Sequence, residues 1–510
     1  MKRDGATVSL WQEIPDYASQ TTSANKVYDV LIAGGGITGV TTGLLLQKAG
    51  LNVAIAETHS LCFGTTGGTT AHINSFFDTT YDQIESDFGA DAAKLVSEAT
   101  RQSRELFRRH ATDYNINCGF EEKDGYVYAQ TPEQVELLDK MYDASKRAGS
   151  EVEYVQEIPV PVAFQKAIVY RRQAQLHPTR YVQALAKAFE EGGGVILQDC
   201  PVEKVDSDND LLRIETGSGT IRAKNLVWAT HIPPGINLLH FRNAPYRSYA
   251  ISVKLKSGTY PDALAYDMYD PYHYYRTQDI DGEKYLIIGG EDHKTAHEEN
   301  TNACFNDLVA HARKYFDIEE ITHHWSSQYF EPSDGLAYIG HLPGNPENVY
   351  VATGYSGNGI TYSHIAAITL TDLITKGKSE FADLFAPGRV KPVAGFASFV
   401  QENADVVKEF VAKRINVEKI DGLSELAHGE AKVVKYEGET VAVYKDENGG
   451  IHALNPVCTH AKCIVGWNRA EKTWDCPCHG ARYDINGEVL TGPARRGLEK
   501  VEIENKATES

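Results

Sequence analysis

Four cysteines and two histidines near the end of the chain carry side chains suited to binding metal. The stretches "CTHAKC" and "CPCHG" place Cys458 and His460 in one loop and Cys476 and His479 in another, with 15 residues between His460 and Cys476. Two thiolates and two imidazoles divided in pairs suit a [2Fe–2S] cluster, in which one iron binds the cysteines and the other binds the histidines. A structural zinc ion could use the same four atoms, but it would not need the two further cysteines of these stretches.

A second set of residues, near the start of the chain, is suited to binding a dinucleotide. Gly34, Gly36 and Gly39 form a G-x-G-x-x-G motif, and Glu57 follows the last glycine by 18 residues. The first glycine permits a tight turn, the second lets the backbone approach a pyrophosphate, and the third allows a helix to lie close to a strand. Glu57 can accept hydrogen bonds from both ribose hydroxyls, which disfavours a 2′-phosphate. The motif alone leaves FAD and NAD open.

The elements expected around these residues would hold them in place. A β-rich run over residues 27–33, a helical pattern that ends at Gly50 and a second β-rich run over residues 53–56 form a βαβ unit around the glycines. Tyrosine-rich strands alternate over residues 246–290, and a strand, a glycine loop and a helix return over residues 335–374. The pattern predicts an α/β doubly wound nucleotide-binding domain with an inserted antiparallel-sheet α+β substrate domain.

Composition and charge exclude several classes of protein. The net charge of −20 argues against nucleic acid or an anionic membrane surface as a partner. The first 25 residues contain no apolar run suited to a signal peptide, and the longest stretch without formal charge, residues 348–371, is interrupted by glycines and hydroxyl residues. Eight cysteines in 510 residues do not indicate a secreted disulfide scaffold. We therefore expect a soluble cytoplasmic protein without a membrane span.

Three stretches resemble one family of flavoenzymes. "NLVWAT" (residues 225–230), "GTTGGTTAH" (residues 64–72) and the late "GLAYIGHLP…NVYVATGYSGNGITYS" resemble the FAD-dependent amine and amino-acid oxidoreductases of the D-amino-acid oxidase superfamily, over roughly residues 26–388. The resemblance implies FAD as the cofactor, with the late glycine loop and the following helix against the flavin pyrimidine ring. Residues expected at that ring are Gly354, Gly357, Gly359, Ile360 and Thr361. Thr66 and Val205 are further expected contacts of the cofactor.

His72 allows a more specific hypothesis. The dimethylglycine-dehydrogenase branch of this superfamily attaches its flavin covalently through a histidine in a comparable Thr/Gly-rich stretch, which "GTTGGTTAH" resembles loosely. The tryptophan usual before that histidine is replaced here by Ala71. We therefore favour a histidine that caps or lines the flavin pocket over one that forms a covalent bond.

The C-terminal stretches resemble Rieske proteins of the respiratory type over roughly residues 417–510. That resemblance implies a disulfide between Cys463 and Cys478 that joins the two loops, and "TGPA" (residues 491–494) matches the same type. The family usually carries Ser and Tyr after the second histidine, whose hydroxyls donate hydrogen bonds to cluster sulfurs. Here Tyr483 is kept but Ala481 replaces the serine, so we expect a potential below that of the respiratory proteins.

From Val417 onward, short strands alternate with turn signals, which predicts a small all-β Rieske domain of about ninety residues. A helical pattern before it predicts a connecting helix. The expected division of the chain is an FAD-binding domain from residues 26–118, 171–236 and 326–388, a substrate domain from residues 119–170 and 237–325, a linker helix over residues 389–416 and the Rieske domain over residues 417–510.

Candidate substrate residues come from the predicted strand "DPYHYYRTQ", where Tyr274 and Arg276 share one face. Arg276 could clamp a carboxylate, although a structural salt bridge is an equally open interpretation. His341 could face the flavin, but a purely structural role is the favoured interpretation for this histidine. Weaker candidates of the same sort are Arg247, Tyr249 and Tyr355.

Flavin and cluster in one chain indicate a dehydrogenase. An amine or amino acid would deliver a hydride to FAD, and electrons would pass singly to the cluster and then to an external one-electron carrier. Two alternatives stay open: an oxidase that uses O₂, with the Rieske domain as a redox sensor, and a reductase fed through the cluster by a partner that NAD(P)H reduces. The single G-x-G-x-x-G motif argues against a nicotinamide site within this chain.

Overall fold

The computed structural model describes residues 3–19, 27–390 and 417–503. The first of its sheets has eight strands, and its main path runs β16-β17-β10-β1-β2-β7, with β8 and β9 continuing from β10. Strands β1, β2, β7, β10 and β17 are mutually parallel and largely apolar, as expected of strands covered on both faces. The strands are β1 (Val27–Ala33), β2 (Val53–Ala56), β7 (Val195–Leu197), β8 (Val202–Asp208), β9 (Leu211–Thr216), β10 (Gly219–Trp228), β16 (Tyr338–His341) and β17 (Val349–Thr353).

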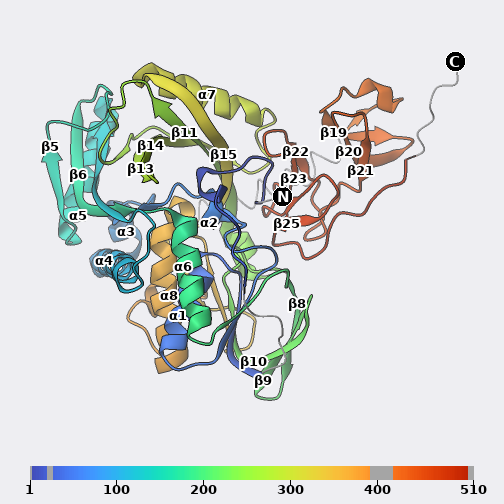
Figure 1. Ribbon diagram of the computed structural model, residues 1–510, viewed down its shortest axis with the longest axis horizontal. Helices are drawn as coiled ribbons and strands as arrows, with labels where there is room; N and C mark the ends of the chain where they lie inside the picture. The colour runs from blue at the N-terminus through green and yellow to red at the C-terminus, as the bar shows by residue number, and fades with distance from the viewer. Residues whose placement is uncertain (1–2, 20–26, 391–416, 504–510) are drawn as a thin grey trace.

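Helices cover one face of this sheet. They are α1 (Ile37–Lys48), α6 (Pro178–Glu191) and α8 (Gly359–Lys376), which lie side by side in Figure 1. The antiparallel strands β8 and β9 form a separate lobe with β10, and a second buried cluster of apolar side chains fills the space beside them. The parallel order brings the loops after β1, β10 and β17 to the same edge of the sheet, where a cofactor can bind.

The second sheet has nine strands, in the order β15-β11-β14-β13-β12-β4-β6-β3, with β5 paired to β6. Its pairs are antiparallel except for β12 with β4. Two of its strands, β6 (Lys166–Gln175) and β15 (Ile318–Pro332), run across the domain boundaries predicted at residues 171 and 326. The ladder of β15 with β11 continues through Ser326, whereas the register of β6 with β4 shifts at residues 171–172. The other strands are β3 (His72–Ile73), β4 (Glu121–Ala129), β5 (Val152–Val155), β11 (Asn243–Leu255), β12 (Leu264–Tyr266), β13 (Tyr274–Ile280) and β14 (Glu283–Lys294).

Helix α7 (Thr301–Tyr315) packs on β11 and β14, and its apolar side chains form a core with that end of the sheet. The helices beside the opposite end are α3 (Tyr81–Phe88), α4 (Ala90–Asp113) and α5 (Pro132–Arg147), shown in Figure 1. Short helical turns are η1 (Leu10–Gln12), α2 (Thr65–Gly68), η2 (Leu238–Arg242), η3 (Ser356–Asn358), α9 (Ala382–Phe385) and η4 (Leu423–Glu425). None of the helices in the described ranges combines the length and the hydrophobicity needed to cross a membrane.

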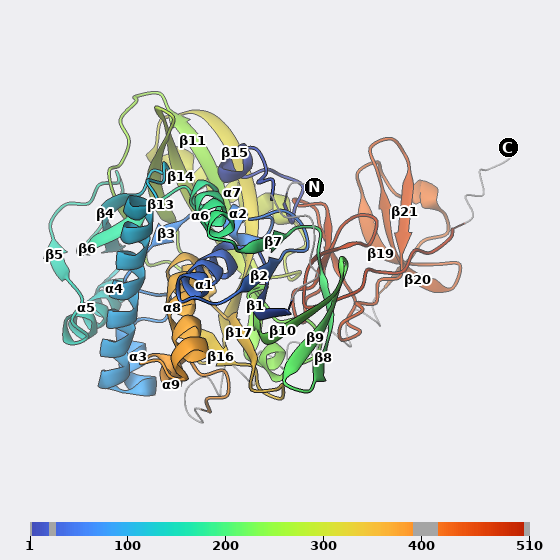
Figure 2. The same ribbon diagram turned by 60° about the horizontal axis from the view of Figure 1, so that its bottom comes forward.

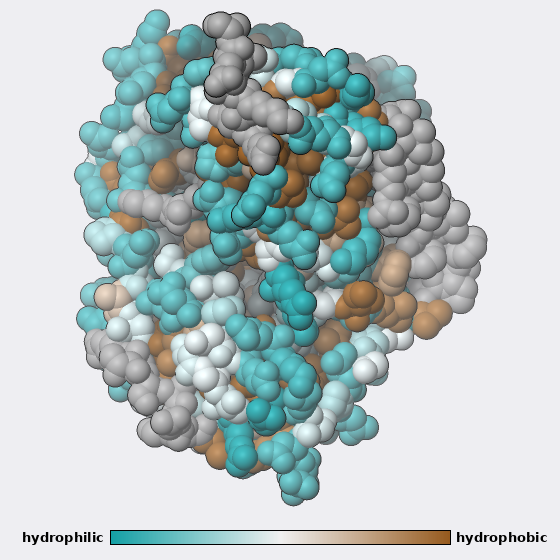
Figure 3. Space-filling view, turned by 90° about the vertical axis from the view of Figure 1, so that its right-hand side faces the viewer, coloured by the Kyte–Doolittle hydropathy of each residue, from teal (hydrophilic) through white to brown (hydrophobic). Residues whose placement is uncertain are grey.

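Residues 417–503, here the C-terminal domain, form two four-stranded sheets beside the main body (residues 27–390). The sheet that contains β22 to β25 lies next to the main body, whereas β19, β20 and β21 project away from it (Figures 1 and 2). Seen from its own end, the domain presents many hydrophilic side chains around a smaller group of hydrophobic ones (Figure 3). Most of the predicted linker helix lies outside the described residues. The strands are β18 (Glu418–Lys419), β19 (Ala431–Tyr436), β20 (Glu439–Lys445), β21 (Ile451–Leu454), β22 (Gly466–Asn468), β23 (Thr473–Asp475), β24 (Arg482–Tyr483) and β25 (Val489–Thr491).

Candidate functional site

The glycine motif forms the tight strand-to-helix turn that its spacing predicts. Gly34 has a φ of +108°, and a Cβ there would lie 2.5 Å from the carbonyl oxygen of Ala229. A Cβ on Gly39 would lie 1.9 Å from the carbonyl oxygen of Gly34, so α1 can approach β1 only without a side chain at this position. Gly36 is the N-cap of α1 and lines a cavity. The N-terminus of α1 therefore opens toward this cavity with its partial positive charge.

Glu57 and Thr66 stand beside this turn. Glu57 accepts hydrogen bonds from the backbone N–H groups of Gly35 (2.6 Å) and His59 (2.8 Å), and burial raises the pKa of its carboxyl. The Thr66 hydroxyl accepts one from the N–H of Ile37 at 3.1 Å. Glu57 and Thr66 both line the cavity.

Val205 does not take the place expected of it. Val202 and Glu203 line the cavity, whereas Val205 lies further along β8 and does not line it, although both valines pack against the second apolar cluster. The first residues of β8, rather than those in its middle, face the cavity. The predicted cofactor contact therefore moves from Val205 to Val202 and Glu203.

The cavity has a volume of about 640 Å³ and runs from the glycine motif to the tyrosines of the second sheet. Gly357, Gly359 and Ile360, at the N-terminus of α8, line it as well, so a second helix N-terminus opens into the same space. Gly354 has a φ of +72° and a Cβ on it would lie 2.5 Å from Asn243 Oδ1, which explains the glycine in this turn. Thr361 does not line the cavity. Its hydroxyl donates to the carbonyl of Asn74 and accepts from the N–H of Asn74, both at 3.1 Å, and so ties α8 to the segment after β3.

These residues fit FAD. The bare backbone at Gly34 and Gly36 leaves room for a pyrophosphate, the α1 N-terminus supplies partial positive charge, and Glu57 is placed for a ribose. The α8 N-terminus is placed to stabilise negative charge on a reduced flavin ring.

His72 lines the cavity on strand β3. Its Nδ1 lies 2.5 Å from the Tyr266 hydroxyl, and its Nε2 is buried without a hydrogen-bond partner. Burial, helped by the nearby Arg276 guanidinium, holds the pKa of His72 well below its usual value. The ring is therefore neutral and has one nitrogen free for a bound group, and covalent attachment stays a hypothesis.

Arg276 is not in the cavity, so the structure corrects the prediction that it clamps a carboxylate. The side chain is fully buried, and its Nη1 donates to the carbonyls of Thr70 (2.8 Å), Ala71 (2.8 Å) and Leu176 (3.2 Å). Burial lowers the pKa of its guanidinium to about 9. Arg276 thus supports the backbone that carries His72. Arg276 and Tyr274 share one face of β13, but Tyr274 lines the cavity whereas Arg276 lies beneath the segment before β3.

The other predicted substrate residues separate into two groups. Tyr274 and Tyr355 line the cavity. His341 is exposed at the end of β16 and lies against Tyr350, so it does not face the flavin site. Tyr249 is buried in the core under α7, where its hydroxyl lies 2.8 Å from His293 Nε2.

Cys458, His460, Cys476 and His479 come together in the C-terminal domain. The two thiols are buried and free, and the two imidazole rings are 4.9 Å apart between centroids. The Nδ1 atoms of both histidines are buried without a hydrogen-bond partner. Cys463 and Cys478 form a disulfide with an S–S distance of 1.95 Å. Two free thiols and two unpaired imidazole nitrogens are the donor set that a Rieske [2Fe–2S] cluster requires.

The hydroxyl of Tyr483 lies 3.2 Å from Cys458 Sγ, so the expected donor to a ligand sulfur is in place. Ala481 is fully buried and has no polar side-chain atom to offer. One of the two donors usual in the respiratory proteins is therefore present.

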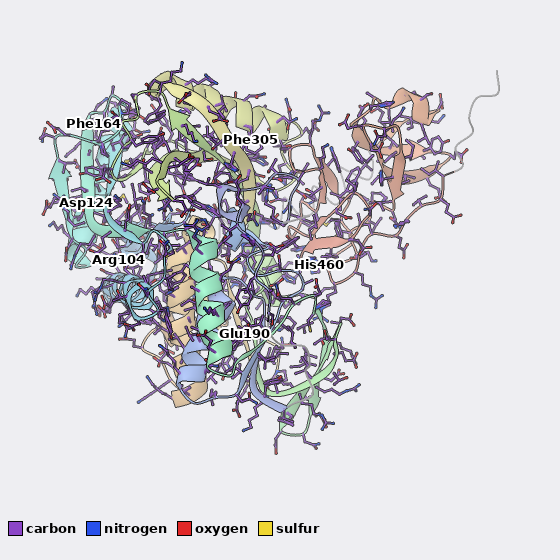
Figure 4. All side chains as sticks on the ribbon, viewed as in Figure 1. Arg104, Asp124, Phe164, Glu190, Phe305 and His460 are labelled. Atoms are coloured by element: carbon purple, nitrogen blue, oxygen red, sulfur yellow. A yellow bond between two sulfur atoms is a disulfide. The ribbon has the colours of Figure 1, made fainter. Side chains whose placement is uncertain are left out.

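The cluster-binding loops lie against the main body. His460 Nε2 is 3.1 Å from the carbonyl oxygen of Gly235 and 3.1 Å from His240 Nδ1, and Figure 4 places His460 on the side of its domain that faces the main body. The opposite nitrogen of His240 lies 2.8 Å from the carbonyl oxygen of Pro233. His460 and His479 are only 9% and 4% exposed. The two candidate ligand histidines are thus covered by the loop that follows β10.

That loop also forms a wall of the FAD cavity. Thr230, His231, Ile232 and Pro234 line the cavity, and so do residues 489–492, Ala494 and Arg495 of the C-terminal domain. Arg495 donates hydrogen bonds to the carbonyls of Glu203 (3.1 Å) and Pro234 (3.3 Å). The segment between Thr230 and Gly235 therefore has the cavity on one side and the ligand His460 on the other.

A buried network of charges joins the two domains, and it includes residues that the sequence did not single out. Its six members, here the charge cluster, are Arg3, Asp4, Arg247, Glu471, Asp475 and Arg482, none more than 2% exposed.

Arg482 donates to Asp4 at 2.7 Å and to Asp475 at 3.1 Å, and Arg3 pairs with Glu471. Arg247, expected at the substrate, instead lies 3.7 Å from both Glu471 and Asp475. Three cations and three anions balance, so the cluster is a structural joint between β11, the C-terminal domain and the N-terminal segment.

The sequence of the N-terminal segment, residues 3–19, did not predict its structural role. Trp11 is fully buried and donates from its indole nitrogen to the carbonyl of Thr69 at 2.5 Å. The charges of Arg3 and Asp4 pair with Glu471 and Arg482, which lie 468 and 478 residues away in the chain, so the local sequence does not indicate these partners.

Comparisons with known proteins agree with this geometry. The FAD dependent oxidoreductase family matches residues 29–373, and the Rieske [2Fe-2S] domain family matches residues 416–502. A Bacillus subtilis (strain 168) relative, "Putative Rieske 2Fe-2S iron-sulfur protein YhfW", is 30% identical over 93% of this chain and 94% of its own. Gamma-glutamylputrescine oxidoreductase of Escherichia coli (strain K12) is 23% identical over 70% of this chain and 86% of its own.

Among solved structures, glycine oxidase from Geobacillus kaustophilus superposes with a TM-score of 0.60 at 21% identity, covering 71% of this chain and 99% of that one. That similarity supports the fold of the main body. The chain belongs to the FAD dependent oxidoreductase family and carries a Rieske [2Fe–2S] domain at its C-terminal end.

Proposed function

We propose that this protein oxidises an amine or an amino acid at FAD and passes the electrons singly through its Rieske cluster to an external one-electron carrier. The position of the segment between Thr230 and Gly235 supports the route, because this segment borders both the cavity and the ligand His460. The free thiols of Cys62, Cys118, Cys200 and Cys304 in the main body are consistent with a cytoplasmic site of action.

Bound FAD accepts two electrons from a C–H bond beside an amine nitrogen, whereas a [2Fe–2S] cluster accepts one at a time. Oxidation of the C–N bond to an imine releases two electrons and two protons, and water then hydrolyses the imine. The residues of the chain have to orient the amine, exclude water from the cavity and hold the cluster domain in place. Positioning therefore supplies most of the expected rate enhancement.

An anaerobic mixing experiment tests this proposal. Oxidised protein with both cofactors is mixed with a panel of amines, N-methyl amino acids and amino acids, while flavin absorbance and the paramagnetic resonance signal of the reduced cluster are recorded together. Loss of flavin absorbance followed by growth of the cluster signal is the expected result. Flavin loss with a cluster that stays oxidised would contradict the route and favour an oxidase in which the Rieske domain acts as a sensor.

Two substitutions sharpen the test. Glu471→Gln removes one anion of the charge cluster and should slow cluster reduction relative to flavin reduction, because the domains dock less firmly. Glu488→Gln, at an exposed position of the same domain, serves as the matched control and should leave both rates unchanged.

A further inference from the structure

The end of the cavity farthest from the glycine motif is built from tyrosines and carboxylates. Tyr272 donates toward Asp78 at 3.4 Å, and Tyr329 donates to Asp292 at 2.9 Å. Tyr274 lies 5.6 Å from Tyr272 between ring centroids. Together with Tyr266, these residues line the cavity and are here the tyrosine end.

The two carboxylates of the tyrosine end lack a cation. Asp78 accepts from the N–H of Gly357 at 2.7 Å, and Asp292 Oδ1 is buried without any hydrogen-bond partner. Burial raises the pKa of Asp78, and burial and the nearby Asp78 raise the pKa of Asp292 to about 7. The Asp292 side chain is partly buried and Asp78 is exposed, and both line the cavity. A cation bound there would supply the partner that the buried Oδ1 atom of Asp292 lacks.

The nearest positive charge is already neutralised. His273 lies 2.9 Å from Asp267 and 3.3 Å from Glu291, and although burial opposes it, these two carboxylates raise the pKa of His273 to about 9. One imidazolium therefore faces two carboxylates of its own. His72, at the neighbouring wall, is neutral. The tyrosine end therefore has two carboxyl groups and, among the described residues, no cation committed to them.

No described lysine or arginine at this end is available to a substrate carboxylate. Among the described residues that line the cavity, the one lysine or arginine is Arg495, which donates to the carbonyls of Glu203 and Pro234 near the C-terminal domain. Arg276 is held by three backbone carbonyls outside the cavity. A substrate carboxylate would meet Asp78 and Asp292 without a compensating cation.

We infer that the tyrosine end binds a cationic amine that carries no carboxylate beside its amino group, with the ammonium group between Asp78 and Asp292 and against the tyrosine rings. This inference rests on the proposed function and narrows it from amines and amino acids to amines. Carboxylates supply the charge that an ammonium requires, and the faces of tyrosine rings attract cations.

Paired compounds test the inference on the protein with FAD and cluster bound. Each pair is an amino acid and the amine that lacks its carboxylate: sarcosine and dimethylamine, proline and pyrrolidine, ornithine and putrescine. Binding is read as a shift in the absorbance of the oxidised flavin, and turnover as anaerobic flavin bleaching. We expect the amine of at least one pair to bind at least tenfold more tightly than its amino acid.

Substitutions at Asp292 complete the test. Asp292→Asn should weaken amine binding at least tenfold, and Asp292→Glu, which keeps the charge, should restore part of it. The matched control Asp307→Asn changes an exposed aspartate on α7 outside the cavity and should leave binding unchanged.

The failures of the two proposals are distinguishable. If amino acids bind and bleach the flavin as well as their amines do, and Asp292→Asn has no effect on binding, the inference is overturned while the proposed electron route stands. If amines shift the flavin spectrum in the wild type but not in Asp292→Asn, and the cluster nevertheless stays oxidised, the binding site stands and the proposed route fails.

Discussion

Glu471 in the charge cluster is a fully buried carboxylate and Asp292 at the tyrosine end is a partly buried one, and their surroundings move their pKa values in opposite directions. Burial disfavours the charge of Glu471, yet Arg3, Arg247 and Arg482 outweigh it and lower its pKa to about 2. Asp292 has no such partners, and burial raises its pKa to about 7. Charge that is balanced within the chain holds domains together, whereas charge left unbalanced in a cavity is available to a ligand.

Two arginines of the second sheet also have different partners. Arg247 on β11 reaches the charge cluster, and Arg276 on β13 reaches backbone carbonyls. Neither contributes a cation to the cavity between them. The polarity of the cavity is therefore a property of the fold, because β11 and β13 direct both guanidinium groups away from it.

The largest effect is expected from removing one charge of the charge cluster. Glu471→Gln leaves Arg3 and Arg247 without part of their countercharge in a fully buried site, and removal of one partner from a buried ion pair costs about 3–5 kcal/mol. The free energy of unfolding measured with denaturant should fall by that order. Glu488→Gln is the control, and an equal loss in both variants would contradict a special role for the charge cluster.

An intermediate effect is expected from the pH dependence of stability. Asp292 binds its proton more tightly in the folded protein than in the unfolded chain, so its contribution favours folding at low pH and is lost as pH rises from about 4 to about 7. Asp4 and Glu471, whose pKa values fall to about 2, contribute stability above the unfolded value that is lost as pH falls toward 2. The two regions therefore have opposite slopes.

The substitution Asp292→Asn isolates the contribution of Asp292 to the pH dependence of stability. Relative to the wild type without amine, the variant should gain stability between pH 5 and pH 7 by up to about 1.4 kcal/mol per pH unit. The groups that face Asp292 and set this window are Ser248, Tyr329, Asp78 and His273. Melting temperatures of both proteins at pH 5 and pH 8 give the measurement, and a difference between the proteins that does not change with pH would refute the assignment. An added amine should stabilise the wild type more than the variant.

Local spacing made some of this site predictable from sequence. The glycine motif and the four cluster ligands lie within short loops, so their spacing in the chain nearly fixes their spacing in space. The pairing of Tyr274 with Arg276 on one strand face was also deducible from alternation. Alternation does not reveal whether a face leads into a cavity or beneath another strand, and on this point the prediction for Arg276 was wrong.

The joint between the domains could not be deduced in the same way. Arg3 and Glu471 are separated by 468 residues, and Arg482 and Asp4 by 478. Nothing in the sequence around either residue specifies such a partner, because in the sequence each side chain cannot be distinguished from an ordinary surface charge. Val205 shows the same limit on a smaller scale: the correct strand was expected near the cofactor, but the register that places Val202 and Glu203 at the cavity depends on how β8 packs.

The smallest effect is expected at the iron–sulfur cluster, whose charge changes by one electron. The Tyr483 hydroxyl lies 3.2 Å from Cys458 Sγ. A thiolate that binds iron can only accept this hydrogen bond, which strengthens when the iron–sulfur cluster becomes more negative. A difference of about 1 kcal/mol between the two redox states corresponds to roughly 40 mV for one electron. Tyr483→Phe should therefore lower the potential by about that amount, and Ala481→Ser should raise it, in a redox titration followed by paramagnetic resonance. Potentials unchanged in both variants would mean that the surrounding domain, rather than these hydroxyls, sets the driving force for electrons that arrive from the cavity.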